Sequence, residues 1–235
     1  MISWSNAWNG FYEQMILKGG YRTALQGLLT TIEIAVLGLI IGVILGTLVA
    51  LIKVMPRYNR MVRIGSAICD VYVGFFRGTP IVVQLLLGYF VLLPMFGITS
   101  NAILVAIAIF GLNSGAYVSE IMRAGIQSVD AGQLEAGRAM GLPFWPAMLK
   151  IVIPQSIKNI LPTLGNEFIV LIKETSVVSF IAVVDLTKAF KAIGDANYEY
   201  IMPYLMLALV YLVLVLLITL LIKIMERRLK KNERA

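Results

Sequence analysis

Glu167 is the clearest candidate for a functional side chain in this sequence, because it is an ionisable residue within an apolar stretch, residues 150–172. A carboxylate in hydrocarbon is costly and by default marks a pathway or a binding site. If Lys158 lies near one membrane boundary, the helical rise of 1.5 Å per residue puts Glu167 about 14 Å deeper. We expect its carboxylate to attract a cationic group; the structural alternative is a buried ion pair with Arg77 or Lys173.

Polar residues continue along the same stretch. Asn159, Thr163 and Asn166 follow one another at spacings of four and three residues, so on a helix they form a stripe that Glu167 borders. Pro154 and Pro162 remove backbone hydrogen bonds, and the freed carbonyls are tolerated at membrane depth only against protein or a water-filled cavity. The pattern predicts a polar chamber, with interhelical hydrogen bonding as the alternative for each stripe residue.

Two further apolar segments carry polar groups that could line this chamber. The run Arg77-Gly-Thr-Pro80 joins a permissive residue to one without a backbone donor, which predicts a break in the helix. Broken helices near mid-membrane can present polar groups to a small charged solute. The candidate lining residues beside Glu167, Asn166 and Thr163 are Thr79, Gln84, Asn113, Ser114 and Tyr117, with Glu120 on the same helix face as the last of these. Glu33 and Asp70 lie nearer helix ends, where a solvated or headgroup position is the simpler explanation.

The elements that must position these residues are membrane helices. Of the 235 residues 59% are hydrophobic and only 14% charged, and the mean hydropathy is +0.86. An ordinary soluble domain is much less apolar. The chain has no histidine and a single cysteine, Cys69, which excludes disulfide frameworks, histidine metal centres and histidine general bases.

Apolar runs and their breakers predict an all-α fold with five membrane-spanning helices. The expected spans are 24–52, 68–96, 101–124, 150–172 and 201–224. Basic residues follow the first and third spans and fill the tail: Lys53, Arg57, Arg60 and Arg63; Arg123, Arg138 and Lys150; Lys223, Arg227, Arg228, Lys230, Lys231 and Arg234. The positive-inside rule therefore predicts an external N-terminus and a cytoplasmic C-terminus. Topology accounts for the net charge of +7, and no nucleic-acid partner is implied.

Small residues predict where the helices approach one another. Gly38, Gly42 and Gly46 in the first span, and Gly111 and Gly115 in the third, recur every four residues and leave a groove for a neighbouring helix. The alternative is a pore lining. We find no repeat and no soluble domain, so residues 1–235 are expected to form a single membrane domain with its core at about 20–228.

A short helix is predicted at about 130–142, on the basic side of the membrane. Asp130 can cap its start, Gln133 can complete a capping box, Gly141 suits a left-handed stop and Pro143 prevents continuation. Leu134, Gly137 and Gly141 form a narrow apolar stripe that could enter a groove on a partner. The alternative is an amphipathic helix that rests on membrane lipid.

Six motifs then point to a family. Glu135-Ala-Gly-Arg-Ala-Met-Gly141 with Ile153-Pro154 resembles the cytoplasmic "EAA" loop of ABC-transporter permeases, with Gly137 where the usual pattern has alanine. The order of the other five is similar to that in the polar amino acid uptake branch: Phe76-Arg-Gly-Thr-Pro80, Asn113-Ser-Gly-Ala-Tyr117, Gly132-Gln-Leu-Glu-Ala136, Leu161-Pro-Thr-Leu-Gly-Asn166 and Lys173-Glu-Thr-Ser176. The resemblance covers about residues 20–228.

This resemblance implies the type I ABC importer permease fold and a subunit of the bacterial cytoplasmic membrane. The implied partners are ATP-binding-cassette ATPase subunits, a second permease that is an identical copy or close paralogue, an extracytoplasmic solute-binding protein and membrane lipid. The ATPase-coupling residues would be Glu135, Ala136, Gly137, Arg138 and Gly141. No cofactor is implied, and the sequence lacks the phosphate-binding G-x-x-x-x-G-K-[S/T] loop, so ATP hydrolysis is assigned to the partner.

The implied function is import of a polar amino acid. Glu167 modestly favours arginine, lysine or histidine, with glutamine next. A stand-alone secondary transporter or channel is the alternative, although the duplicated halves common in such folds are not visible. An intramembrane enzyme would need a nucleophile and a base, and no such set stands out.

Overall fold

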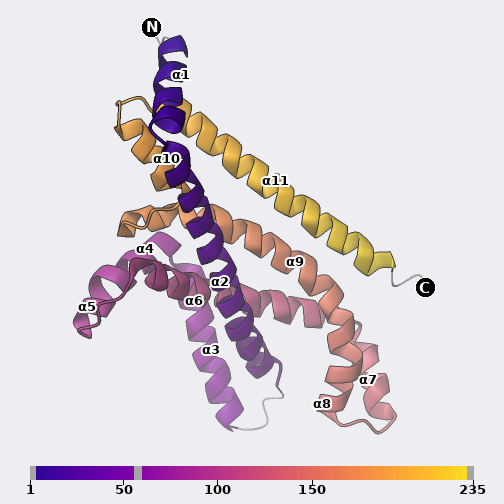
Figure 1. Ribbon diagram of the computed structural model, residues 1–235. Coiled ribbons are helices and arrows are strands. Elements are labelled where there is room, and N and C mark those ends of the chain that lie inside the picture. The colour runs from indigo at the N-terminus through magenta and orange to yellow at the C-terminus, as the bar shows by residue number, and fades with distance from the viewer. Residues whose placement is uncertain (1–3, 56–59, 232–235) are drawn as a thin grey trace. The chain divides into compact units, whose positions relative to one another are not determined.

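The computed structural model describes residues 4–55 and 60–231, and every regular element within them is a helix (Figure 1). The predicted all-α class is confirmed. Arg57 and Arg234, two of the basic residues used to predict topology, lie outside the described residues.

The helices follow the chain in this order: α1 Trp4–Tyr12, η1 Glu13–Leu17, α2 Gly20–Val54, α3 Arg60–Gly78, α4 Ile81–Leu87, η2 Gly88–Leu92, α5 Leu93–Met95, α6 Ala102–Gln127, α7 Ala131–Ala139, α8 Phe144–Ala147, η3 Met148–Val152, α9 Ile153–Glu174, η4 Thr175–Ile181, α10 Leu186–Asp195 and α11 Ile201–Lys231. Of the η segments, η1, η2 and η3 are π-helical and η4 is a 3₁₀-helix.

Within the described residues, three helices, α2, α6 and α11, are long and apolar enough to cross a membrane. The segment expected to span at 68–96 is instead a broken pair, α3 and α4–α5, interrupted at Thr79 and Pro80, which gives four spans if the pair counts as one. The break was predicted from Arg77–Pro80. The expected fourth span, 150–172, forms η3 and α9, which is not among the helices that meet the length and apolarity test. The chain is thus a helical membrane protein, and the count of five spans stays a prediction.

The chain forms two compact units. The first comprises residues 1–38, 80–110 and 169–218, and the second residues 39–79, 111–168 and 219–235.

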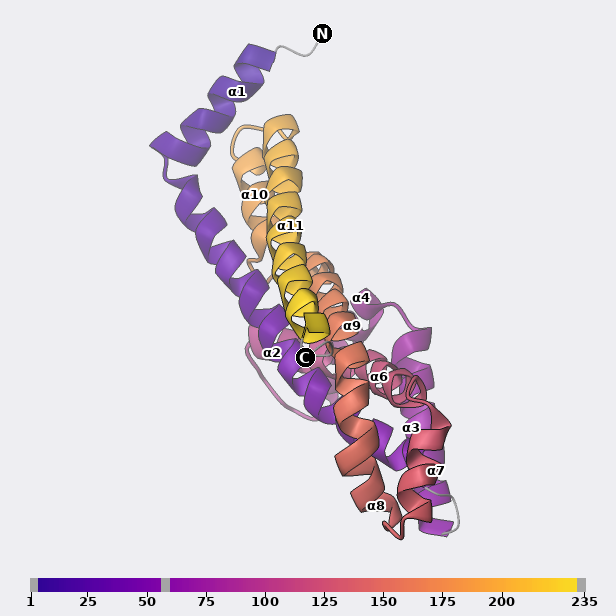
Figure 2. The same ribbon diagram turned by 90° about the vertical axis from the view of Figure 1, so that its right-hand side faces the viewer.

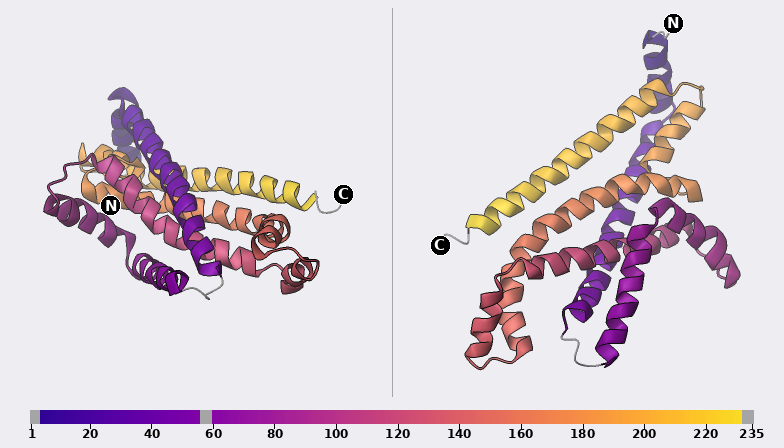
Figure 3. Two further views of the ribbon diagram at one scale, coloured as in Figure 1. Left: turned by 90° about the horizontal axis from the view of Figure 1, so that it is seen from below. Right: turned by 180° about the vertical axis from the view of Figure 1, so that it is seen from behind.

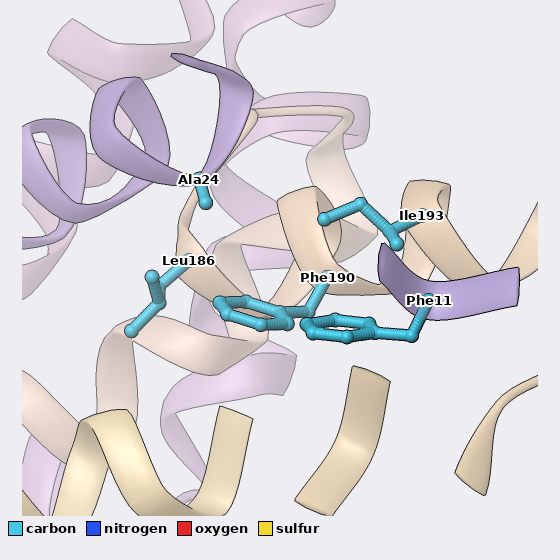
Figure 4. Close-up of a cluster of buried hydrophobic side chains, with 5 residues drawn as sticks. All are labelled: Phe11, Ala24, Leu186, Phe190 and Ile193. Atoms are coloured by element: carbon cyan, nitrogen blue, oxygen red, sulfur yellow. The ribbon is translucent and has the colours of Figure 1, made fainter. Parts of the chain in front are cut away.

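The first unit has a core built around α10. Leu186, Phe190 and Ile193 of α10 pack with Phe11 of α1 and Ala24 of α2 (Figure 4). These α10 residues recur at spacings of four and three, so one helix face is apolar. Figures 1 and 2 both show α10 lying beside the start of α11, and partly buried side chains of α11, including Met206 and Val210, pack against this core.

The second unit is held by close helix packing at glycines. A Cβ on Gly42 would lie 2.6 Å from Ser114 Oγ, and one on Gly46 would lie 2.7 Å from the Val118 side chain. A Cβ on Gly111 would lie similarly close to the Ile41 side chain. Interhelical packing, rather than a pore lining, is confirmed for these glycines of α2 and α6.

The short helix α7 also belongs to the second unit. It folds back against α8 and η3, as Figures 1 and 3 show. Its predicted ends are confirmed: Asp130 is the N-cap and Gly141 has a positive φ of 88° beyond the last turn.

Candidate functional site

A polar hollow of about 380 Å³ lies in the second unit. Tyr117 and Thr163, both predicted from sequence as site residues, line it together with Asn159 of the expected polar stripe. The other lining residues are Arg77, Glu120, Ile121, Ala124, Gly125 and Ser128. The structure therefore places a cation, an anion, a phenol, an amide and hydroxyls around one space, which is the set of groups that a small zwitterion requires.

Glu167 lies one helical turn away from this hollow. Ser114 Oγ donates to Glu167 Oε1 at 3.3 Å, and the two residues are 0% and 8% exposed. Ser114 precedes Tyr117 by three residues on α6, and Thr163 precedes Glu167 by four on α9, so the pair and the hollow occupy successive turns, about 5 Å apart along each helix. Glu167 does not itself line the hollow.

Arg77 contacts the hollow from the end of α3. Its guanidinium carbon lies 5.4 Å from the centre of the Tyr117 ring, a cation–π arrangement. Its Nη1 lies 3.9 Å from Glu120 Oε2. Arg77 thus contacts Glu120, a partner that the sequence did not suggest.

Glu120 is the centre of an ion network that sequence reasoning missed. Lys53 Nζ lies 2.8 Å from Glu120 Oε1 and 3.1 Å from Asp70 Oδ1, and Arg123 Nη2 lies 2.6 Å from Glu120 Oε2. Asp70 was expected to be solvated; it is about half exposed, yet it is paired. The signal in the sequence was the occurrence of one or more ionisable residues at the basic-side end of three separate apolar segments, since charges at membrane depth usually pair with one another.

Asn113 and Thr79 stabilise the broken end of α3. Pro80 has no N–H with which to bond the carbonyl four residues earlier, that of Phe76. Asn113 Nδ2 of α6 donates to this carbonyl at 3.3 Å, and Thr79 Oγ1 donates to the Phe75 carbonyl at 2.8 Å. Asn113 therefore makes a hydrogen bond between α6 and α3.

The remaining predicted residues are not brought to the hollow. Gln84 is buried in α4 and belongs to the first unit. Asn166 is exposed on α9 and does not line the hollow. Thr163, which does line it, also donates to the Asn159 carbonyl at 3.1 Å, and Asn159 Nδ2 donates to Ser128 Oγ at 2.8 Å.

The helix α7 has fixed ends. Asp130 Oδ1 accepts from Gly132 N at 2.7 Å, and the C-terminus closes with bonds from Gly141 N to Arg138 O and from Leu142 N to Gly137 O. This pair of bonds is the Schellman arrangement, which the positive φ of Gly141 permits. The capping box predicted for Gln133 is not the contact observed; its Oε1 accepts from Gln155 Nε2 at 3.4 Å instead.

The faces of α7 differ from the sequence expectation. Glu135, Ala136, Arg138 and Gly141 are exposed, whereas Gly137 is buried against its own chain, where a Cβ would meet Ile151 Cδ1 at 2.6 Å. The prediction that Gly137 belongs to an outward-facing stripe is therefore wrong. The residue is small because Ile151 of η3 approaches it, and the ridge available to another protein consists of its exposed neighbours.

The fold and these motifs define a transport protein. Residues 38–231 match the sequence profile of the binding-protein-dependent transport system inner membrane component family, and the chain belongs to this family.

Named relatives narrow the class. The chain is 41% identical over 209 residues to the arginine transport system permease protein ArtQ of Bacillus subtilis (strain 168), with 89% of this chain and 93% of the relative covered. It is 40% identical over 204 residues to the putative glutamine transport system permease protein GlnP of Rickettsia bellii (strain RML369-C), with 87% and 91% covered.

Solved structures of transporters have a fold similar to that of this chain. The crystal structure of an amino acid ABC transporter with histidines matches with a TM-score of 0.83 and 40% identity, covering 91% of this chain and 97% of that chain. The MetNI methionine ABC transporter in an inward-facing conformation matches with a TM-score of 0.72 at 17% identity, covering 89% and 97%, which supports the shared fold.

Proposed function

We propose that this chain is the membrane permease of an ABC importer for a polar amino acid. The observation that carries the proposal is the hollow in the second unit, which combines Arg77, Glu120 and Tyr117 with hydroxyl and amide groups. An amino acid has an ammonium and a carboxylate, and complementary charges in a confined space are what recognise both. Relatives named as arginine and glutamine permeases support the substrate class.

The substrate proposal depends on Glu167. Glu167 lies on α9, one turn from a residue of that helix that lines the hollow. Its carboxylate accepts a hydrogen bond from the neutral hydroxyl of Ser114, which lies one turn from the hollow on α6. If the path of the solute follows these helices, Glu167 favours a cationic amino acid, arginine before lysine or histidine, with glutamine next. Asn166, Asn113 and Thr79 are proposed to border the same path; Gln84, in the first unit, stays a predicted binding residue.

ATP-driven movement is proposed to enter through α7. This helix carries no catalytic constellation, has both ends fixed, and exposes Glu135, Ala136, Arg138 and Gly141. We place it on the cytoplasmic side, with the N-terminus outside, against a partner ATPase subunit. An extracytoplasmic solute-binding protein completes the proposed importer, which the family description supports. A second permease, identical or closely related, is part of the same proposal.

The test is reconstitution of the chain in vesicles with its ATPase subunit and a solute-binding protein. We expect uptake of labelled arginine that requires ATP, and loss of uptake when the ATPase subunit is omitted. Concentration of the amino acid by the permease alone would overturn the proposal.

Substrate choice is tested separately by Glu167→Gln, with Asn166→Asp as a variant that adds a charge on the neighbouring exposed position. We expect Glu167→Gln to lower the preference for arginine over glutamine about tenfold, since one tenfold step corresponds to the loss of a single favourable charge contact. An unchanged preference would remove Glu167 from the selectivity argument.

A further inference from the structure

A second polar hollow lies in the first unit, along one face of α2. Thr23, Gln26, Thr30 and Glu33 follow one another at spacings of three, four and three residues, so they share a face of this otherwise apolar helix. All four line a hollow of about 620 Å³, and Asn101 and the segment 182–184 are among its other walls. Its volume is sufficient for an amino acid with its hydration water.

Glu33 is the one charged residue among those that line this hollow. Within residues 4–55 and 60–231, no hydrogen bond or ion pair engages its carboxylate. Two other carboxylates of the same unit are paired: Glu13 with Lys18 at 2.9 Å, and Asp195 with Lys191 at 2.9 Å. The hollow thus offers a carboxylate whose partner is not supplied by the described chain.

The position of Glu33 along α2 strengthens this interpretation. The run that follows it, Ile34–Ile52, contains no charged residue and at 1.5 Å per residue spans about 28 Å, close to the thickness of the hydrocarbon layer. Glu33, which is exposed, therefore stands at the border of that layer, on the face of α2 that lines the hollow. An unpaired carboxylate at such a border attracts cations from the aqueous side.

We propose that the Glu33 hollow is a first, weak binding site for the cationic group of the transported amino acid, a primary ammonium or a guanidinium. This inference rests on the proposed function, because it gives the same solute a second site in a different unit of the chain. The carboxylate of Glu33 accepts charge-assisted hydrogen bonds from the cation. The amides of Gln26 and Asn101 and the hydroxyls of Thr23 and Thr30 replace part of its hydration shell.

The experiment measures occupancy of the hollow directly. Gln26→Cys is introduced together with Cys69→Ala, and the complete transporter in vesicles is labelled from outside with a membrane-impermeant maleimide. We expect L-arginine to protect the cysteine, and L-glutamine, which carries no net charge, to protect it less. Adding Glu33→Gln should raise the arginine concentration for half protection about tenfold, since the charge of the acceptor is lost while its shape is kept.

Glu13→Gln is the matched control. It removes an exposed carboxylate of the same unit that is already paired with Lys18, and it should leave the protection by arginine unchanged. Elution of each variant as an intact complex shows that loss of protection is not loss of fold.

Three results would overturn the inference. One is protection by arginine that is equal in the parent transporter and in the Glu33→Gln variant. Another is labelling that no arginine concentration reduces. The third is protection by the solute-binding protein free of amino acid, which would identify the hollow as a protein-docking surface. Failure of the proposed function is distinguishable, because absence of ATP-driven arginine uptake alongside intact, Glu33-dependent protection would reject import and leave the site in place.

Discussion

The helices α7 and α10 are similar in construction and opposite in environment. Each is short, and each begins at an aspartate whose side chain accepts backbone N–H bonds, Asp130 for α7 and Asp185 for α10. Five residues of α10 are buried, against one residue of α7, Gly137. A helix that satisfies its own ends but buries little of its surface has that surface free for another protein, whereas α10 is part of its own unit's core. Capping thus determines at which residue a helix begins or ends. Packing determines whether its surface is part of the core or is available to another protein.

The largest expected effect is that of Phe190→Ala in α10. Phe190 is 2% exposed and packs against Phe11, so its truncation leaves a cavity that we expect to cost about 3–5 kcal/mol of stability. Thermal unfolding in detergent measures it. Leu134→Ala in α7, which removes a partly buried side chain, is the matched variant and should cost much less; equal losses would erase the contrast between the two helices.

Asp185→Ala should come next. Asp185 is fully buried, and its carboxylate accepts from Thr187 N at 2.9 Å and from Lys188 N at 3.0 Å. Loss of both bonds leaves two partly buried donors unsatisfied, which we expect to cost about 2 kcal/mol of unfolding free energy. Asp185→Asn keeps an acceptor and should recover at least half of this. A neutral Asp185→Ala would show that the cap contributes nothing to the core.

Asp130→Ala should act on transport more than on unfolding. The exposed cap of α7 stabilises that helix locally by about 1 kcal/mol, and few other contacts depend on it. We expect fewer amino acids moved per ATP hydrolysed, with a nearly unchanged unfolding temperature, and recovery in Asp130→Asn. A transport stoichiometry that is unaffected would make the cap irrelevant to coupling.

Gly137→Ala should have a small effect, because two contributions oppose each other. Alanine favours the helix by about 1 kcal/mol, while the new methyl group displaces the flexible end of Ile151. Since Gly137 faces its own chain, association with the ATPase subunit, measured by co-purification, should be unchanged. Ala136→Leu adds bulk on the exposed ridge and should weaken that association. If Gly137→Ala weakened the association more than Ala136→Leu did, Gly137 would belong to the surface that contacts the ATPase subunit.

The Asp185 cap should make stability depend on pH. Burial raises the pKa of the Asp185 carboxyl, although the bonds from the Lys188 and Thr187 amides oppose the shift. A carboxyl whose pKa is raised on folding binds its proton more tightly in the folded state, so its contribution to stability is full below its unfolded pKa and is lost as pH rises through the folded pKa. We expect Asp185→Asn to remove this component from unfolding curves measured across that acidic range, and Asp130→Asn to leave it; identical curves for Asp185→Asn and the parent chain would contradict it.

Local features of this molecule were predictable from sequence, and contacts between distant segments were not. The ends of α7 and the break at Pro80 follow from residues within a few positions of each, so the sequence located both. The inward direction of Gly137 depends on the approach of Ile151, and the Glu120 network joins α2, α3 and α6. Neither follows from spacing alone, because helical periodicity says which residues share a face but not what that face meets.

The helix α10 shows a signal that was present and overlooked. Asp185 at a cap position precedes Leu186, Ala189, Phe190 and Ile193 at spacings of three, one and three, the pattern of an amphipathic helix. The segment lies between the expected spans at 150–172 and 201–224. The polar stripe that leads to Glu33 on α2 is likewise visible in the sequence, at the spacing of one helix face.

The contact of Gly137 with Ile151 has a mechanical consequence. Ile151 belongs to η3, a π-helical turn in which each carbonyl bonds five residues ahead and the backbone holds one residue more than an α-helical turn would. A force applied to α7 therefore reaches α9 through the π-helical segment η3, which directly precedes α9. We expect bending to concentrate at residues 148–152, which would make this stretch the elastic joint and leave α7 itself undeformed.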